Sequence, residues 1–320
     1  MELKTKPYAH QLDEFELSRD MEARGLFWEM GCVDAETEYL TPDGWRRFDS
    51  YDGMSLVAQW DPETGRASFV VPLRYVTEHA DRVIHFWNTR GLNQVLSPNH
   101  RVVHLQKRTL KPQWATAGEM AEALLRSGKS TARRLPSAFT LQHEGRGTGL
   151  SESELRLQIA VMADGHFPAN CSTSRCTMRL KKPRKIRRLR ELLGGREVHE
   201  RYEESTGFTV FRFDAPRRQK RWPWYDTTAS ERRVIVDEVW RWDGSSAKDG
   251  RGWQFFSKNQ SDVEFIQFIA ASEGLVAATS FDRRGYWSVR VRGTRTDGFL
   301  VRGKNVSIIE KPQPVYCFQV

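Results

Sequence analysis

The chain carries one run of elements twice, and this internal repeat limits the available folds more than any other feature. A Ser-x-x-Glu capping box at Ser151 opens an apolar helix that stops at Asp164-Gly165. A second apolar helix, residues 230–242, stops in the same way at Asp243-Gly244. The pair predicts a module of two similar halves related by a pseudo-twofold axis.

The residues after each Asp-Gly continue the repeat. Both stretches show strand-like sequence, then a helix, then another strand. The helices are predicted at residues 183–193 and 262–273, and the later strands at 208–213 and 286–292. We expect residues 150–300 to form a domain of their own.

Residues 32 to about 112 show short apolar runs joined by tight turns. Pro-Asp-Gly at 42–44 is a turn sequence, because proline presets φ and glycine accepts positive φ. The runs between turns are rich in Val, Ile, Phe and Trp, as strands are. Strands are predicted at 68–73, 83–87, 101–105 and 314–320, and a helix at 115–127. The chain is therefore expected to be mixed α+β, with an all-β domain first and the repeat inserted behind it.

Composition adds further limits. The chain has 50 Lys+Arg against 41 Asp+Glu, a formal net charge of +9, which favours a polyanion as partner. No apolar run is long enough to cross a bilayer, and the N-terminus lacks the apolar core of a signal peptide. We expect a cytoplasmic, intracellular protein with reduced cysteines and no membrane partner. Cys171 and Cys176 lack a second Cys/His pair at zinc spacing and are predicted to bind no metal.

A phosphate-binding loop begins at residues 26–31 and is left incomplete. The Gly-Lys-Ser/Thr that would hold ATP phosphates does not follow Gly31, and the nucleophile Cys32 stands there instead. Upstream, residues 6–25 resemble the adenine-recognition entry and first helix of a Swi/Snf-type helicase. The resemblance implies that residues 1–31 are a helicase fragment in which Gln11 is a nucleotide-binding remnant. A working ATPase is the least favoured alternative, because the loop lacks its lysine and Ser/Thr.

The region that starts at Cys32 resembles the Hint fold of inteins, which are self-excising protein inserts. Cys32 stands at the first intein position, and residues 96–100 match the Thr-x-x-His signature with Ser97 and His100. Cys317 lies in a strand where most inteins place Asp. The resemblance implies that residues 32–135 are the N-terminal part of a splicing domain, and that residues 301–320 are its return strand.

The chemistry of that family assigns a role to each of these residues. The Cys32 thiol attacks the carbonyl of Gly31 and converts the peptide bond to a thioester, with no cofactor. Because a peptide bond is a resonance-stabilised amide, it must be twisted or protonated, and His100 is expected to donate a proton to the leaving nitrogen. Ser97 is expected to fix the amide or the oxyanion, Gly31 to allow close approach, and Cys317 to tune or relay protons.

Inteins end in His-Asn followed by Cys, Ser or Thr, and no such residues follow Val320. The resemblance therefore implies that this chain is an N-terminal part, a split half or a truncated product. Its implied partner is a complementary C-terminal intein fragment.

The two Asp-Gly helices resemble the LAGLIDADG motifs of homing endonucleases, which pack side by side with their carboxylates together. The resemblance implies an αββα-type domain in which Asp164 and Asp243 are catalytic and bind Mg²⁺. Double-stranded DNA, the intein-free host gene, is the implied partner. Lys182 and Lys258, at similar distances after each Asp-Gly, are candidates to polarise water. The predicted DNA contacts are Lys182, Arg184, Lys185, Arg187, Arg188, Lys258, Arg290 and Arg292, and Arg212 is a further strand candidate.

Together these features predict an intein precursor fragment: a helicase-type extein, a Hint domain and an inserted endonuclease, encoded by a host cell or a phage. Two alternatives stay open. One is a free-standing LAGLIDADG endonuclease that does not splice, and the other is a DNA-binding module with inactive carboxylates.

Overall fold

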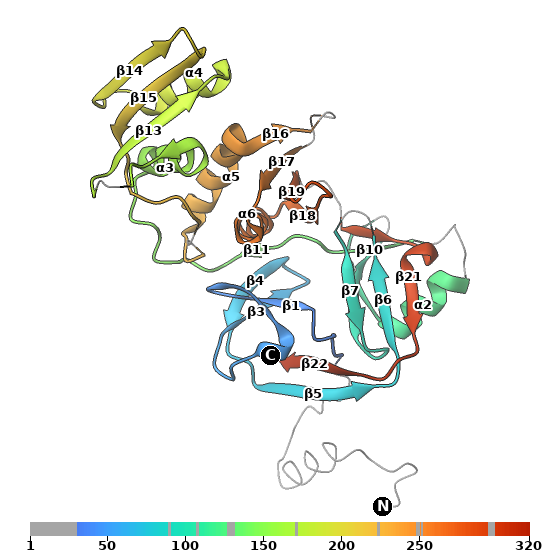
Figure 1. Ribbon diagram of the computed structural model, residues 1–320. Helices are drawn as coiled ribbons and strands as arrows, with labels where there is room; N and C mark the ends of the chain where they lie inside the picture. The colour runs from blue at the N-terminus through green and yellow to red at the C-terminus, as the bar shows by residue number, and fades with distance from the viewer. Residues whose placement is uncertain are drawn as a thin grey trace, which may run out of the picture.

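The protein is described by a computed structural model that covers residues 31–88, 91–106, 109–126, 132–169, 172–222, 225–247, 250, 252–293 and 298–320. Within these residues it is a mixed structure of short β-sheets and five α-helices. A region built mainly of strands lies beside a region in which helices cover two further sheets (Figure 1).

The strand region consists of small, mostly antiparallel sheets joined by tight turns. At the first turn, Gly44 has φ 119°, and the Thr41 hydroxyl donates to its carbonyl at 2.8 Å. The strands before the helical insertion are β1 (Glu38–Thr41), β2 (Gly44–Arg47), β3 (Val57–Asp61), β4 (Arg66–Val70), β5 (Arg74–Ala80), β6 (Val83–Trp87), β7 (Asn93–Leu96), β8 (Arg101–Leu105), β9 (Pro112–Thr116), β10 (Arg133–Leu135) and β11 (Thr140–Leu141). Helix α2 (Ala117–Arg126) follows β9, and a short 3-10 helix, η1 (Phe48–Ser50), follows β2.

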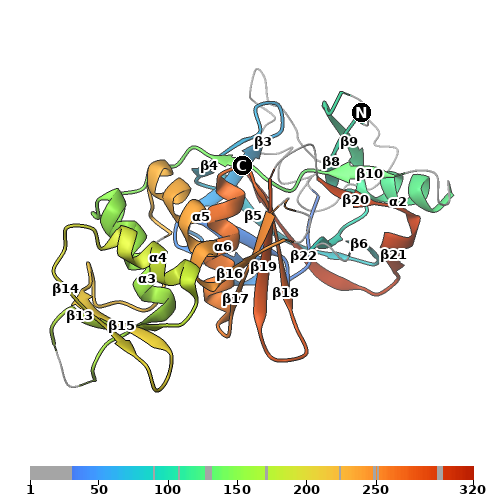
Figure 2. The same cartoon turned by 90° about the horizontal axis from the view of Figure 1, so that it is seen from above.

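The last residues return to the strand region. Strand β20 (Phe299–Val301) pairs with β10, β21 (Val306–Ile309) with β6, and β22 (Gln313–Gln319) with β5, with η2 (Gly303–Asn305) between β20 and β21. Leu135 and Phe299 are partners in the β10–β20 ladder, so the chain leaves and re-enters this region at adjacent points. Figure 2 shows the helical region as an insertion between these points.

The insertion repeats the order helix, two strands, helix, two strands. Its sheets have matching strand orders, β12-β13-β15-β14 and β16-β17-β19-β18, all antiparallel. The first half contains α3 (Glu152–Asp164), β12 (Gly165–His166), β13 (Arg175–Leu180), α4 (Pro183–Leu192), β14 (Val198–Glu203) and β15 (Phe208–Asp214). The second contains α5 (Ala229–Asp243), β16 (Gly244–Ser246), β17 (Gly252–Ser257), α6 (Gln260–Ser272), β18 (Val276–Phe281) and β19 (Trp287–Arg292).

Helices α3 and α5 pack against each other at the centre of the insertion (Figure 1). Both begin with a complete capping box, Ser151 with Glu154 and Thr228 with Glu231. The first box was predicted; the second starts α5 at Ala229, one residue before the predicted start, because Thr228 satisfies the free N–H groups of the first turn. Both helices end at the aspartate of their Asp-Gly pair.

One apolar cluster joins the two regions. It contains the buried faces of α3, α5 and α6 and also Leu40, Ala67 and Leu141 from the strand region. A second cluster fills the space under α2, and a small third cluster contains Cys32, Val83, Val315 and Cys317. The thiols that the sequence singles out are therefore part of a core.

Candidate functional site

Cys32 is held between two strands that are distant in sequence. The next residue, Val33, exchanges two main-chain hydrogen bonds of 2.8 Å with Tyr316 on β22. The carbonyl of Cys32 accepts from the N–H of Ser97, just after β7, at 2.9 Å. Residues 32 and 33, directly after the Gly31–Cys32 bond, are thereby held between β22 and the residue that follows β7.

Ser97 binds the nitrogen of that bond. Its hydroxyl oxygen accepts the N–H of Cys32 at 3.0 Å. Residues 97–100 form a turn closed by the His100 N–H on the Ser97 carbonyl at 3.0 Å, and the His100 carbonyl accepts from Ala117 at 2.8 Å. The turn and the start of α2 therefore place the Ser97 and His100 side chains on the same peptide bond.

Gly31 lies directly against His100. A Cβ on Gly31 would be 2.0 Å from the Cα of His100 and 2.6 Å from its Cγ, far inside van der Waals contact. A side chain at position 31 therefore cannot be accommodated with His100 in this place.

The imidazole of His100 is shielded from water. Its Nδ1 is buried and has no hydrogen-bond partner. Burial lowers the pKa of His100, while the main chains of Cys32 and Gly31 act in the opposite direction. The imidazole is therefore mainly neutral at pH 7, and its protonated form is a stronger acid than an exposed histidine.

The thiols of Cys32 and Cys317 form a buried pair. Their sulfurs are 3.3 Å apart, with Cys32 donating, and the residues are 2% and 4% exposed. This hydrogen bond raises the pKa of Cys32 above its usual range and lowers the pKa of Cys317. The pair therefore ionises first at Cys317, which can then accept the Cys32 proton.

The four residues predicted for peptide-bond chemistry thus lie around one bond. A nucleophilic thiol follows the carbonyl of Gly31, and the ionised form of a second thiol can take its proton. A hydroxyl accepts the N–H of Cys32, and the histidine lies directly against Gly31. Such an arrangement can convert an amide to a thioester.

The second predicted site lies where α3 and α5 end. Lys185 of α4 brings Asp164 and Asp243 together: its Nζ is 2.5 Å from Asp164 Oδ2 and 3.6 Å from Asp243 Oδ1. Burial raises the pKa of Asp243, and the Lys185 charge opposes this effect. Lys220 is nearby and donates to the carbonyls of Val161 and Met162 at 3.2 and 2.8 Å.

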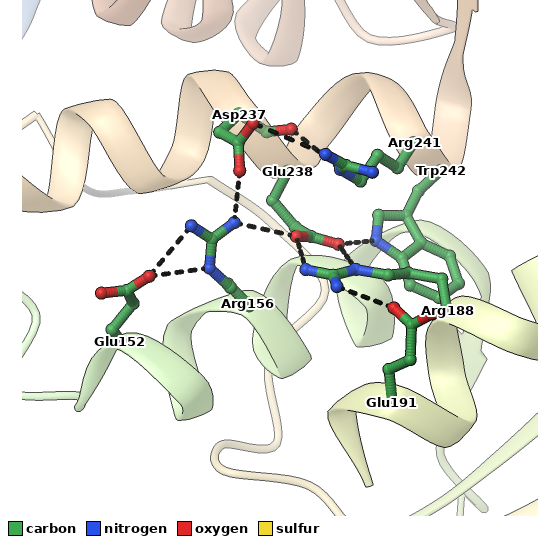
Figure 3. A network of polar contacts seen from close by, with 8 residues as sticks. All are labelled: Glu152, Arg156, Arg188, Glu191, Asp237, Glu238, Arg241 and Trp242. Carbon is green, nitrogen blue, oxygen red and sulfur yellow. Dashed lines mark hydrogen bonds and ion pairs between the residues drawn. The ribbon is translucent and has the colours of Figure 1, made fainter.

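A buried ion-pair network holds α4 to α5 (Figure 3). Glu238, fully buried, accepts two hydrogen bonds from Arg188, at 2.9 and 2.5 Å, and one from Arg156 at 3.1 Å. The indole of Trp242 donates to the same carboxylate at 3.0 Å. Sequence analysis missed Glu238, although an acid in the middle of an apolar helix is the signal that could have revealed it.

The predicted DNA contacts fall into two groups. Lys185 and Arg188 bind carboxylates inside the protein, and Arg184 donates to the carbonyls of Arg241 and Gly244 at the end of α5. Lys182, directly before the first residue of α4, and Arg187 on α4 are exposed. On the sheets, Arg212, Arg290 and Arg292 share the outer faces, and Lys258 lies exposed after β17, near the Tyr286 ring.

Several predictions lie outside the described residues: Gln11 and the helicase-like segment, and Cys171. Cys176 is buried in β13 as a free thiol. Among the described residues, no group of three His, Cys, Asp or Glu side chains is placed to hold a metal ion. The described helices include none long and apolar enough to cross a membrane.

A divalent cation between Asp164 and Asp243 does not fit this arrangement, because the Lys185 ammonium lies there. Metal ligands need free carboxylate oxygens, and one oxygen of each aspartate faces the lysine. Mg²⁺ binding by Asp164 and Asp243 therefore stays a prediction, one that this arrangement of the three side chains does not fit.

Comparisons with known proteins give only distant likenesses. No protein-family model and no curated protein matches the chain. Similar solved structures include a splice-inactive variant of the AceL NrdHF class 3 split intein, at 24% identity and TM-score 0.26, covering 28% of this chain and 56% of the intein. The chain thus spans about half the length of that intein.

Others are the homing endonuclease I-DmoI in complex with DNA and Mn, at 12% identity and TM-score 0.31, and full-length DUF199/WhiA from Thermotoga maritima, at 10% identity and TM-score 0.34. They cover 44% and 46% of this chain, and 89% and 53% of their own. I-DmoI has also been solved with Mg and with Ca.

Proposed function

We propose that the chain rearranges its own backbone at the Gly31–Cys32 bond, as the first step of protein splicing. The observation that carries this proposal is the convergence of Cys317, Ser97 and His100 on one peptide bond that begins at a glycine. The strand region would then be a Hint-type splicing domain interrupted by a LAGLIDADG-type insertion, and the segment before it an N-extein.

The Cys32 sulfur forms a bond to the Gly31 carbonyl carbon, and its proton passes to the Cys317 sulfur, 3.3 Å away. The carbon–nitrogen bond then breaks, and the Cys32 nitrogen becomes a free amine. The protonated form of His100, the minor form at pH 7, supplies the proton that this nitrogen needs and becomes neutral. Ser97 holds the nitrogen in place until it leaves.

The test is thiol-induced cleavage followed by mass spectrometry. Dithiothreitol is expected to release residues 1–31 as a thioester or acid, and hydroxylamine as the hydroxamate. Cys32→Ala should release nothing under either condition. An intact chain after prolonged treatment with both reagents would contradict the proposal.

The partner proposed for the later steps is a complementary intein segment with His-Asn and a cysteine-led extein. A synthetic peptide of that kind should be ligated to residue 31 by the wild-type chain. Cys32→Ala should abolish the ligation, and thioester formation without ligation would argue against this partner but not against the first step.

A second function, binding of double-stranded DNA, is proposed for the insertion. The observation that favours it is the basic outer surface of the two sheets, where Arg212 and Arg290 are exposed at inner strands of matching sheets. Such surfaces neutralise phosphates and reach base edges. An electrophoretic mobility shift with duplex DNA tests it, and Arg212→Ala/Arg290→Ala should weaken binding and flatten its salt dependence.

The predicted double-strand cleavage at the intein-free gene would additionally need a metal at Asp164 and Asp243. Because Lys185 lies between these carboxylates, we propose that the insertion binds DNA, and we propose no cleavage.

A further inference from the structure

Lys185 lies where a cation shared by the two halves of the insertion would lie. Its side chain is 8% exposed, whereas those of Asp164 and Asp243 are 25% and 37% exposed. Its Nζ is within 4 Å of one oxygen of each carboxylate. The Lys185 ammonium therefore lies on the protein-interior side of the two carboxylates, and the aspartates lie between it and the solvent.

The helix that carries Lys185 is held on both sides of it. Arg184 donates to the main-chain carbonyls that end α5, and Arg188 makes two hydrogen bonds to the buried Glu238 (Figure 3). Arg184 and Lys185 come four and three positions before Arg188, spacings that place each of them next to Arg188 on the helix. Moving the Lys185 ammonium away by shifting α4 would break both neighbouring contacts with α5.

The charge between the two helices is already balanced. Lys220 lies close enough to Asp164 and Asp243 for their charges to influence it, and burial lowers its pKa. One lysine, Lys185, pairs with both carboxylates, and the charge of a second lysine, Lys220, is felt by them. A divalent cation added here would leave the site with an excess of positive charge unless a lysine left, and a buried ammonium without a partner is costly.

The two halves differ at this point. Helix α6, the counterpart of α4, contains no Lys or Arg, and its first turn carries Asp262, which accepts hydrogen bonds from Ser257 and Asn259. The second half therefore has no basic residue equivalent to Lys185. One lysine from the first half serves both aspartates.

We propose that the ammonium of Lys185 takes the place of a divalent cation between Asp164 and Asp243, so that the insertion engages double-stranded DNA without a metal at this site. The DNA half of this inference rests on the second function proposed above, and the metal half stands without it.

Mn²⁺ titration of the full chain, followed by electron paramagnetic resonance, tests the metal half. The wild-type chain should show no Mn²⁺ binding that Asp164→Asn or Asp243→Asn removes. Lys185→Ala should create a site at least about tenfold tighter than any in the wild type, and adding Asp164→Asn should abolish it. Lys182→Ala is the matched control, because this exposed lysine lies three positions earlier and should create no site.

Lys185→Met provides a second variant of similar volume in case the alanine disturbs packing. Circular dichroism and gel filtration establish that each variant is folded. A wild-type Mn²⁺ site that either aspartate substitution removes, or a Lys185→Ala variant that folds and gains no affinity, would overturn the metal half.

Binding of a pool of random duplex DNA, measured with EDTA and then with Mn²⁺, tests the DNA half. Equal affinities in both solutions are expected, and binding only with Mn²⁺ would overturn it. Absence of binding in both solutions would overturn the DNA half together with the second function, while the Mn²⁺ titration would still decide the metal half.

Discussion

Gly31 allows His100 to lie against the scissile bond because glycine has no Cβ. The contact with His100 places an imidazole within reach of the scissile bond only because no Cβ intervenes. The residue that precedes the nucleophile is thus part of the site's geometry as well as the acyl group that moves.

Gly31→Ala is therefore expected to slow dithiothreitol-induced cleavage by on the order of 10²-fold, since a displacement of about 1 Å at a reacting bond has effects of that size. Gly293→Ala is the matched control, because a Cβ there meets nothing within 4 Å. Cleavage at the wild-type rate in Gly31→Ala would show that His100 moves freely and is not set by this contact.

The Cys317 sulfur is expected to act as a base for Cys32. Cys317→Ala should reduce the rate of thioester formation by about 10²–10⁴-fold, the usual effect of losing a positioned base. Cys317→Asp should retain much of the activity, because a carboxylate at the same place also accepts a proton. Equal activity in wild type and Cys317→Ala, measured by hydroxylamine trapping, would remove this sulfur from the mechanism.

The lowered pKa of His100 also leads us to expect that the stability of the folded chain depends on pH. Burial lowers its pKa in the folded state, so the unfolded chain binds its proton first as pH falls below the ordinary value of about 6.5. This contribution to stability is present above that pH and is lost as pH falls toward the folded pKa. Between pH 8 and pH 5, chemical denaturation should show a smaller loss of stability in His100→Gln than in wild type. Parallel losses in both proteins would contradict the assignment.

Among the elements, the local sequence predicted strand boundaries best for strands with buried side chains. Strands β6 and β8 match the predicted residues 83–87 and 101–105, because their Val, Ile, Phe and Leu side chains form short apolar runs. Strands β14 and β18 were missed. The first is almost wholly exposed and the second is rich in Ala, Thr and Ser, so neither carries that pattern.

The two candidate sites also differ in how far local sequence could predict them. A nucleophile and a turn with serine and histidine could be read from neighbouring residues, and the structure places them together. The role of Lys185 could not be predicted from neighbouring residues, because it depends on which side of the basic helix α4 faces α5. Charge density alone suggested DNA contact, whereas tertiary packing turns Lys185 and Arg188 inward.

The network around Glu238 is expected to hold helices α3, α4 and α5 in register. Glu238→Gln should lower the free energy of unfolding by on the order of 3 kcal/mol, because Arg156 and Arg188 lose the charge that balances them in a buried setting. Asp237→Asn is the matched control: its carboxylate also pairs with Arg156 but is 51% exposed, so a cost below about 1 kcal/mol is expected. Equal costs in urea denaturation would contradict a special role for the buried carboxylate.

At the scale of the whole molecule, the strand region and the helical insertion share one apolar cluster. Leu141 is central to it: β11 pairs with β4 on the strand side and contacts α6 on the other. Leu141 is also 3% exposed. The two regions are therefore expected to unfold as one cooperative unit, although they differ in fold and in proposed function.

Leu141→Ala tests this coupling. It should destabilise the chain by about 2–5 kcal/mol, the range for truncating a buried leucine. The helical signal in circular dichroism and the reactivity of Cys32 and Cys317 toward a thiol reagent should shift to the same lower denaturant concentration. Leu300→Ala, at a position 37% exposed on β20, should shift neither by much. If the thiols became reactive while the helices stayed folded, the shared cluster would not couple the splicing site to the insertion.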